Sequence, residues 1–487
     1  MTARSRANSS PSKASVPLNR APLPPVPSFP PATLAEWTGG HWTAGPVAAP
    51  AGFAIDTRKL RAGEMFVALR TAARDGHDFL EAAAEAGARA ALVERVVPDC
   101  DLPQLVVADS VQAFQAIAHR HRLAFTGPVT GITGSAGKTS TKDLLARLLG
   151  DRVLATEGNL NNHLGVPLTL TRLDGAEHSF AVVEAGISAA GEMAPLARMI
   201  APDVAVVTLV DHAHTRDLGG LAGVAREKAL LPAAVRSSGL SFFPRKVMNH
   251  EPFQVLAGRR LVIERADVLR PKSSGSETIY YTMTQRAEET AVTIADAATD
   301  TTETYAFRRV SDGMAENAVL AISVARWLGV SPSEIRERIT QWRTSGMRAE
   351  VRREGGRLVY LDCYNANPAS MADALKAFQD LAGTEAPRLY VVGGMEELGG
   401  ESAAKHREVG RRLRLRERDH AFIIGTEAES VAQGAVECGA LDSQLETLSS
   451  LDGVAMNVAR WDGAVFIKGS RRYRLETVMA GEAASTF

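Results

Sequence analysis

One segment restricts the fold of this 487-residue chain more than any other: GITGSAGKTSTK at residues 131–142. It overlaps VTGIT (129–133), a short β-rich run, and it leads into KTSTKDLLARLLG (138–150), which has a helical period and stops at a glycine. A glycine-rich turn between a strand and a helix presents backbone N–H groups to phosphate oxygens. The segment therefore predicts a βα unit whose connecting loop binds phosphate.

The residues of this loop suit a nucleoside triphosphate. Its two later glycines would let the backbone approach closely, Lys138 would place a positive charge on the β- and γ-phosphates, and Thr139 would offer a hydroxyl to Mg²⁺. The strict pattern G-x-x-x-x-G-K-S/T fails at one place, because Ile132 stands where its first glycine belongs. An ordinary glycine-rich turn is the alternative, but the strand–turn–helix context favours ATP or GTP. The expected contacts are Gly134, Ser135, Ala136, Gly137, Lys138, Thr139 and Ser140.

Short apolar runs alternate with helical patterns along most of the chain, which is typical of α/β domains with doubly wound parallel sheets. The length, at roughly 150 residues per domain, suggests about three domains. We expect a small N-terminal α/β domain at 33–125, a central P-loop ATPase-like domain with a parallel sheet at 126–345, and a C-terminal Rossmann-like domain at 346–487. Strands are expected over 65–69, 88–94, 102–109, 129–133, 180–186, 203–210, 358–364, 388–394, 421–425 and 464–469, and helices over 78–88, 110–125, 138–150, 315–329, 370–382 and 402–416.

Residues 1–32 differ in composition from the rest of the chain. Eight prolines fall between Pro11 and Pro31, and the first acidic residue is Glu36. Because such a stretch can neither form a helix nor bury a core, we expect a disordered tail. Its Arg- and Ser-rich, acid-poor composition fits a transit peptide only weakly, and it lacks the apolar region of a secretory signal.

The overall composition excludes several classes of partner. The 55 Lys and Arg residues against 56 Asp and Glu give a net charge of -1, which offers no electrostatic basis for nucleic-acid or membrane-surface binding. No apolar run approaches the ~18 residues that a membrane span needs, so we expect no membrane insertion. The three cysteines fit neither a zinc pattern nor a disulfide framework, which favours a reducing, cytoplasmic compartment.

Two polar residues follow predicted strands of the central block. Glu184 ends one apolar run and His214 follows the next, so both belong to the sheet edge where open α/β sheets bind ligands. Mg²⁺ takes oxygen ligands and occasionally a nitrogen. Singly, each residue could be a turn-capping carboxylate or a surface histidine; together, beside a phosphate loop, they favour a metal site. Lys228 lies in a helical stretch and by itself would be a solvated lysine.

Several segments follow one another along the chain in a recognisable order. They are IDTRKLRAGEMFVAL (55–69) with DGHDF (75–79), GITGSAGKTSTK, TEGNLNNHLGVPLTL (156–170), VVEAGIS (182–188), LDCYNANPASM (361–371), VVGGMEELGGESAAKHREVG (391–410) and FIKGSRRYRLETV (466–478). Together they resemble the Mur ligases, the ATP-dependent amide-bond-forming enzymes of peptidoglycan assembly. The C-terminal segments and the N-terminal one resemble the branch of this family that joins D-alanyl-D-alanine to UDP-N-acetylmuramoyl-tripeptide.

The resemblance implies a role for each matching residue. Lys228 matches a lysine that CO₂ carbamylates, which turns a cation into an oxygen ligand for Mg²⁺. Asn317 would lie near the adenine and Arg348 would contact the nucleotide. The implied catalytic residues are Lys138, Glu184, His214 and Lys228; the metal ligands are Thr139, Glu184, His214 and carbamylated Lys228; further ATP contacts are Asp362 and Asn365; and the substrate contacts are Thr57, Arg58, Asn161 and Asn162.

The reaction that the resemblance implies is a ligation. We expect the chain to act as a monomer. A carboxylate is a poor acyl donor, so the γ-phosphoryl of ATP is transferred to the carboxylate of UDP-N-acetylmuramoyl-tripeptide to give an acyl phosphate. The amine of D-alanyl-D-alanine then attacks and phosphate departs. The protein supplies positioning and charge stabilisation. Because both reacting ends must meet in a dry site, we expect the third domain to close over ATP.

Several positions depart from the family pattern. Leu209 replaces an asparagine, Arg216 an acidic residue, Ala222 a glutamate and Gly313 a histidine, and SFFPRKVMNHEPF (241–253) replaces an N-x-D-D stretch. These departures leave two alternatives open: another Mur-type ligase that adds a single amino acid, and a nucleotide-binding relative without catalysis. A stand-alone P-loop ATPase or kinase would leave the YNANP segment unexplained.

Overall fold

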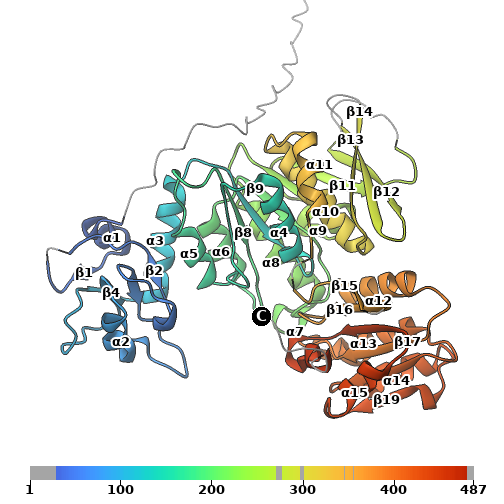
Figure 1. Cartoon of the computed structure of the whole chain (residues 1–487). Coiled ribbons are helices and arrows are strands. Elements are labelled where there is room, and N and C mark those ends of the chain that lie inside the picture. Colours follow the sequence, from blue (N-terminus) through green and yellow to red (C-terminus); the bar gives the residue numbers. More distant parts are fainter. Residues whose placement is uncertain are drawn as a thin grey trace, which may run out of the picture.

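The computed structural model describes residues 29–45, 47–269, 277–296, 301–344, 346–354 and 356–479. Three sheets lie in these ranges, and they form three lobes that follow one another along the chain (Figure 1). Most of the predicted tail, residues 1–28, lies outside the described residues. Ordered structure begins within its last residues, because Phe29 is buried and α1 starts at Pro31.

The N-terminal lobe is a small α/β unit. Its five-stranded sheet, as far as the described residues show it, has the order β1-β5-β4-β3-β2 and is parallel except for β1. Arg122 of its last helix is fully buried, donates to Ile200 O and pairs with Asp203, so it ties this lobe to the central one. The elements are α1 (Pro31–Thr38), β1 (His41–Trp42), β2 (Phe53–Ala54), β3 (Met65–Val67), α2 (Leu80–Glu85), β4 (Ala90–Val93), β5 (Gln104–Val106) and α3 (Ser110–Ala124).

The central lobe carries the phosphate loop at the middle of its sheet. Nine strands are described, in the order β14-β13-β12-β11-β10-β9-β6-β8-β7. The elements are β6 (Val129–Thr133), α4 (Lys138–Leu149), β7 (Val153–Ala155), α5 (Gly165–Leu170), β8 (Phe180–Glu184), α6 (Met193–Ile200), β9 (Val204–Val207), α7 (Thr215–Leu218), α8 (Gly220–Ala233), β10 (Leu240–Pro244), α9 (Glu251–Gln254), β11 (Arg260–Arg265), β12 (Thr278–Gln285), β13 (Glu289–Asp296), β14 (Thr301–Arg308), α10 (Asp312–Trp327) and α11 (Pro332–Thr340).

One end of this sheet differs from the parallel sheet that we expected. Strands β7 to β12 are parallel, but β13 pairs antiparallel with both β12 and β14. Only a short loop separates β12 from β13, which is too short for the crossover that a parallel pair needs. The two strands therefore fold back as a hairpin that extends the sheet.

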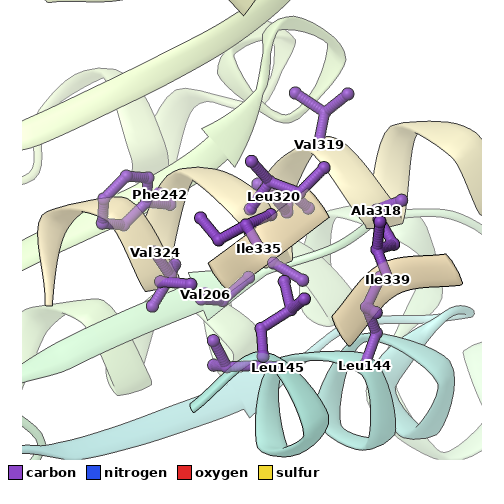
Figure 2. Close-up of a cluster of buried hydrophobic side chains, with 14 of the residues drawn as sticks. Leu144, Leu145, Val206, Phe242, Ala318, Val319, Leu320, Val324, Ile335 and Ile339 are labelled. Carbon is purple, nitrogen blue, oxygen red and sulfur yellow. The ribbon is translucent and has the colours of Figure 1, made fainter. Parts of the chain in front are cut away.

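Helices cover both faces of the central sheet. On one face, α4, α10 and α11 interdigitate with the strands through fully buried aliphatic side chains, including Leu144, Leu145 and Ile335 (Figure 2). On the other face, α5, α6 and α8 pack around β6, β8 and β9. Full burial of one such leucine contributes about 1.5–3 kcal/mol to the free energy of folding. Many such side chains in the two helical layers together hold the β6–α4 turn in place.

The C-terminal lobe repeats the α/β alternation that the sequence predicts. Its six described strands have the order β15-β16-β20-β17-β18-β19, with only β15 antiparallel to its neighbour. The elements are β15 (Glu350–Glu354), β16 (Arg357–Asp362), α12 (Pro368–Ala382), β17 (Arg388–Gly393), α13 (Ser402–Leu413), β18 (His420–Ile424), α14 (Ala428–Val436), β19 (Leu445–Leu448), α15 (Val454–Arg460) and β20 (Ala464–Lys468).

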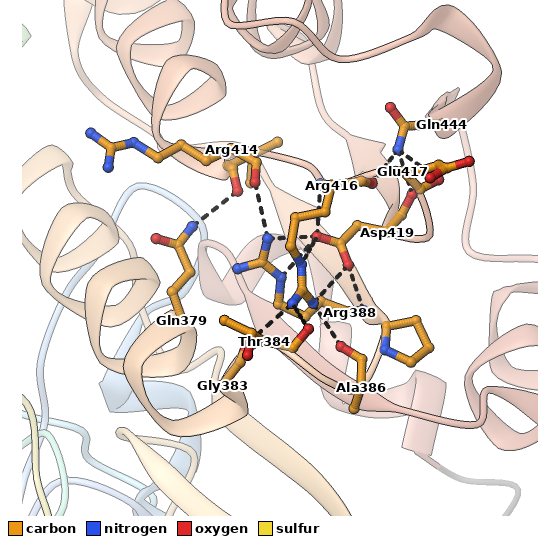
Figure 3. Close-up of polar contacts among 12 residues, drawn as sticks. Gln379, Gly383, Thr384, Ala386, Arg388, Arg414, Arg416, Glu417, Asp419 and Gln444 are labelled. Atoms are coloured by element: carbon orange, nitrogen blue, oxygen red, sulfur yellow. Dashed lines mark hydrogen bonds and ion pairs between the residues drawn. The ribbon is translucent and has the colours of Figure 1, made fainter.

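A buried ionic network joins two strands of this lobe. Asp419 accepts hydrogen bonds from both Arg388 and Arg416, and Gln444 donates to its backbone carbonyl (Figure 3). Burial alone would raise the pKa of Asp419, but these arginines hold it below its ordinary value. The network lies away from the phosphate loop and is structural.

The predicted helices and strands are present, and most strands are shorter than predicted; the apolar run 203–210, for example, contains only β9. Within the ranges that the structure describes, no helix is long and apolar enough to span a membrane. Cys100, Cys363 and Cys438 are all free cysteines.

Candidate active site

The phosphate loop joins β6 to α4 and has a backbone that only glycine allows at two places. Gly134 has φ 155° and Gly137 has φ 81°. A Cβ on Gly134 would lie 1.9 Å from Thr208 Oγ1, and a Cβ on Gly137 would lie 2.4 Å from Asn317 Nδ2. The loop is tied to the end of β9, since Ser135 N donates to Leu209 O at 2.8 Å. These contacts leave its backbone closely packed against neighbouring chain.

Lys138 is the first residue of α4 and folds back over the loop. Its Nζ donates to Gly134 O at 2.8 Å. Burial lowers the pKa of Lys138 below its ordinary value; the Glu184 carboxylate opposes this effect and Arg348 adds to it. The lysine therefore lies within electrostatic reach of both residues, at the place where phosphate oxygens would approach the loop.

Glu184 is the last residue of β8 and its side chain is almost fully buried, at 1% exposure. Its Oε1 accepts a hydrogen bond from Asn161 Nδ2 at 2.7 Å. Its Oε2 has no hydrogen-bond partner within the described part of the chain. A buried carboxylate oxygen without a donor is costly, which makes a cation the fitting partner for it.

The other two predicted catalytic residues come from the chain after β9. His214 is in a left-handed backbone conformation, with φ 55°, and its Nδ1 contacts the carboxylate of Glu397 from the C-terminal lobe. Burial lowers the pKa of His214, an effect that Glu397 opposes. Lys228 of α8 is 2% exposed; burial lowers its pKa well below the ordinary value, and the charge of Lys138 lowers it further.

These residues fit Mg²⁺ only together with ligands from elsewhere. No group of three His, Cys, Asp or Glu side chains gathers at one point in the described residues. Mg²⁺ in nucleotide enzymes usually takes one or two carboxylates and completes its shell with phosphate oxygens and water. The free Oε2 of Glu184 and the hydroxyl of Thr139, both on the same cavity, fit that pattern.

A cavity of about 840 Å³ lies between the central and C-terminal lobes and holds most of the predicted site. Thr57 and Arg58 lie apart from it, in a 3₁₀ turn of the N-terminal lobe where Arg58 pairs with Asp56. Lys228 is buried and does not line the cavity. The predicted residues that line the cavity are Ser135, Ala136, Gly137, Lys138, Thr139, Ser140, Asn161, Asn162, Glu184, His214, Asn317, Arg348, Asp362 and Asn365.

Lys468 and Asn367 are among the cavity residues of the C-terminal lobe that the sequence did not point to. Lys468, at the end of β20, is 1% exposed; its Nζ pairs with Asp362 at 2.6 Å and donates to Asn365 O. Asn367 caps α12 and donates across the lobe boundary to Ser135 O at 2.9 Å. Both lie in segments that resemble the Mur ligases, but nothing local in the sequence distinguishes them from their neighbours.

Three departures from the family pattern have a local explanation in the structure. The backbone carbonyl of Leu209 accepts the hydrogen bond from Ser135 N that holds the phosphate loop, and any residue at this position would supply that carbonyl. Arg216 pairs with its exposed neighbour Asp217. Gly313 N donates to Asp373 Oδ1 at 2.9 Å, and a Cβ on Gly313 would lie 2.8 Å from the other oxygen of that carboxylate.

A phosphate loop on a parallel sheet, covered by a second α/β lobe that adds a lysine and a carboxylate to the same cavity, defines a nucleotide-dependent group-transfer enzyme. The chain belongs to the Mur ligase family of ATP-dependent amide-bond-forming enzymes. It matches the Mur ligase middle domain over residues 132–325, the Mur ligase glutamate ligase domain over 347–471, and the Mur ligase family catalytic domain over 51–122. The predicted family is thus confirmed.

Two relatives illustrate the similarity in sequence. The UDP-N-acetylmuramoyl-tripeptide–D-alanyl-D-alanine ligase of Bacillus subtilis is 31% identical over 440 residues, which cover 88% of this chain and 92% of that protein. The enzyme of the same name from Escherichia coli is 32% identical over 429 residues, which cover 87% of this chain and 92% of that protein.

Solved structures agree with this assignment. MurF from Acinetobacter baumannii has a TM-score of 0.82 at 26% identity and covers 95% of this chain and 99% of its own. MurF ligase from Thermotoga maritima in complex with ADP has a TM-score of 0.74 at 26% identity, and covers 88% of this chain and 96% of its own. The three-lobed α/β architecture that we predicted is therefore confirmed.

Proposed function

We propose that this protein joins D-alanyl-D-alanine to UDP-N-acetylmuramoyl-tripeptide, with ATP as the phosphoryl donor. The observation that carries the proposal is the shared cavity, in which Lys138 and Glu184 of the central lobe face Asp362 and Lys468 of the C-terminal lobe. Two relatives that bear this activity in their names match nearly the whole chain after the tail. This activity requires ATP, a carboxylate and an amine to meet, and a cavity between two lobes can admit all three.

The groups of the cavity suit the formation and breakdown of an acyl phosphate. The backbone N–H groups of the loop and Lys138 would bind the β- and γ-phosphates. They would also stabilise the charge on the phosphoryl group in the transition state of its transfer. Arg348 stacks on Tyr364, 3.7 Å from the ring centroid, and would offer its cationic edge to the nucleotide or the dipeptide. Mg²⁺, held by Thr139, Glu184, His214 and the nucleotide, would neutralise phosphate charge.

In this proposal, CO₂ carbamylates the amine of Lys228. Only a neutral amine reacts with CO₂, and the burial that lowers the pKa of Lys228 favours the neutral form. The product is an anion that balances the positive charge of the neighbouring Lys138. A carbamate at this position would therefore place a negative charge near Lys138 and supply oxygen ligands.

The N-terminal lobe, with Thr57 and Arg58, would hold the uridine nucleotide, and Asn162 would line the path from it to the phosphate loop. We propose the domain limits 33–125, 126–345 and 346–487, a monomer, and a cytoplasmic location, where ATP is available as substrate.

Phosphate release from ATP tests the proposal. The purified protein is supplied with Mg²⁺, UDP-N-acetylmuramoyl-tripeptide and D-alanyl-D-alanine, and each component is omitted in turn. We expect release only in the complete mixture. Release without the dipeptide would indicate an ATPase or a kinase, release with a single amino acid in its place would indicate another ligase of the family, and ATP binding without turnover would indicate a non-catalytic relative.

A further inference from the structure

The loop at residues 394–401 joins the C-terminal lobe to the predicted metal ligand of the central lobe. Thr215 Oγ1 donates to Leu398 O at 3.2 Å, and His212 Nε2 lies 2.8 Å from a carboxylate oxygen of Glu401. Between these two contacts, Nδ1 of His214 meets the carboxylate of Glu397. The histidine therefore has its partner in a different lobe, whereas Glu184 is oriented by Asn161 of its own lobe.

The C-terminal lobe holds this loop firmly. Met395 N donates to His406 Nε2 at 2.8 Å, Glu396 N donates to Ser470 Oγ at 3.2 Å, and Tyr473 OH donates to Glu396 Oε1 at 2.5 Å. Glu397 itself has φ 64°, a left-handed conformation that non-glycine residues keep only where their surroundings impose it. The lobe thus sets the backbone at Glu397, and the carboxylate of this partly exposed side chain reaches His214 from that fixed point.

We propose that Glu397 is a positioning residue that makes metal binding depend on docking of the C-terminal lobe. Its carboxylate holds the proton of His214 on Nδ1 and fixes the ring, so that Nε2 keeps its lone pair for a divalent cation on the cavity side. When the lobe moves away, His214 loses this orientation while Glu184 keeps its own. The inference rests on the proposed function, because it takes His214 as a metal ligand.

Binding of Mn²⁺ as a spectroscopic probe tests this role. The variants are Glu397→Leu and Glu397→Gln, with Glu401→Leu as a matched control because it removes the neighbouring carboxylate contact of the same loop. Free Mn²⁺ is measured by electron paramagnetic resonance with a non-hydrolysable ATP analogue present. We expect Glu397→Leu to weaken Mn²⁺ binding about 10–100-fold. Glu397→Gln should weaken it less, because an amide oxygen still accepts from Nδ1, and Glu401→Leu by no more than about twofold.

Equal weakening by Glu397→Leu and Glu401→Leu would overturn the inference, because it would show an effect of the interface alone. Unchanged Mn²⁺ binding in Glu397→Leu would also overturn it. If the leucine variant does not fold, the glutamine variant carries the test, with severalfold weakening expected and no change as the contrary result. Ligation by the wild-type protein is measured in parallel. Unchanged Mn²⁺ binding in an active ligase refutes only the role of Glu397, whereas absent ligation refutes the proposed function.

Discussion

The two sides of the cavity are built in different ways. On the central side, the phosphate loop, Lys138 and Glu184 are held by contacts within one lobe, such as that of Ser135 N with Leu209 O. On the other side, Asn367 and Glu397 reach their partners across a lobe boundary. The central side is therefore assembled as soon as its sheet folds, whereas the contacts of Asn367 and Glu397 form only when the lobes dock.

This difference separates nucleotide binding from ligation. A loop that its own lobe holds needs no partner to bind phosphate, but an amide bond forms only where donor, acceptor and metal are fixed at once. Changes on the central side should therefore act mainly on the rate of the chemistry, and changes on the C-terminal side should act mainly on stability and on the coupling between the lobes. The following experiments test this division, from the largest expected effect to the smallest.

Substitution of Lys138 by alanine should cause the largest loss. It removes the one loop side chain that places a positive charge beside the γ-phosphate, and we expect kcat/KM for ligation to fall about 10³-fold or more. Thermal unfolding should be unchanged, because the charge of Lys138 is disfavoured by its burial. An active Lys138→Ala enzyme would contradict the assignment of the phosphate loop.

Lys468→Met should act on stability first. It leaves the largely buried Asp362 without its partner, and breaking a buried ion pair costs about 3–5 kcal/mol, of which we expect the lower end because Asp362 keeps some exposure. Urea unfolding measures the change. The double variant with Asp362→Asn should recover part of the loss, and no recovery would show that packing rather than charge is responsible.

Lys228→Ala should reduce ligation roughly 10²-fold with little change in ATP-analogue binding, because it removes the carbamate and not the loop. Acetate should restore part of the activity by supplying the missing carboxylate.

The lowered pKa of Lys228 gives a separate expectation for the wild-type protein. Because the lowered pKa leaves the Lys228 amine neutral at a pH where a free lysine is charged, activity near neutral pH should fall in CO₂-free buffer and return with bicarbonate. Full activity of the alanine variant without acetate excludes the role.

Asn367→Ala should have the smallest effect. It removes the cap of α12, where Oδ1 accepts from Ser370 N, and the contact with Ser135 O. We expect about 1 kcal/mol less stability and a KM for ATP raised several-fold. Ser331→Ala is the matched control, because it removes the cap of α11 without touching the loop. An equal change in KM for both variants would show that the contact across the lobes has no role in ATP binding.

The elements that the sequence predicted best are those with local signals. The helical period of residues 138–150 predicted α4, and the apolar run that reaches Glu184 predicted β8. Both predictions succeeded because periodicity and turn chemistry depend on residues that are near neighbours in the chain. The antiparallel strands β13 and β14 were not predicted, since their pairing partners are chosen by the sheet as a whole.

The same division applies to the site. The sequence alone determined the phosphate loop, the carboxylate at the end of β8 and the three-lobed plan, because each follows from residues close together in the chain. Only the tertiary structure decided that Asn367 meets Ser135, 232 residues away, that Lys468 neutralises Asp362, and that Glu397 contacts His214. Docking of separately folded lobes depends on the shapes of their whole surfaces, and no local pattern encodes that.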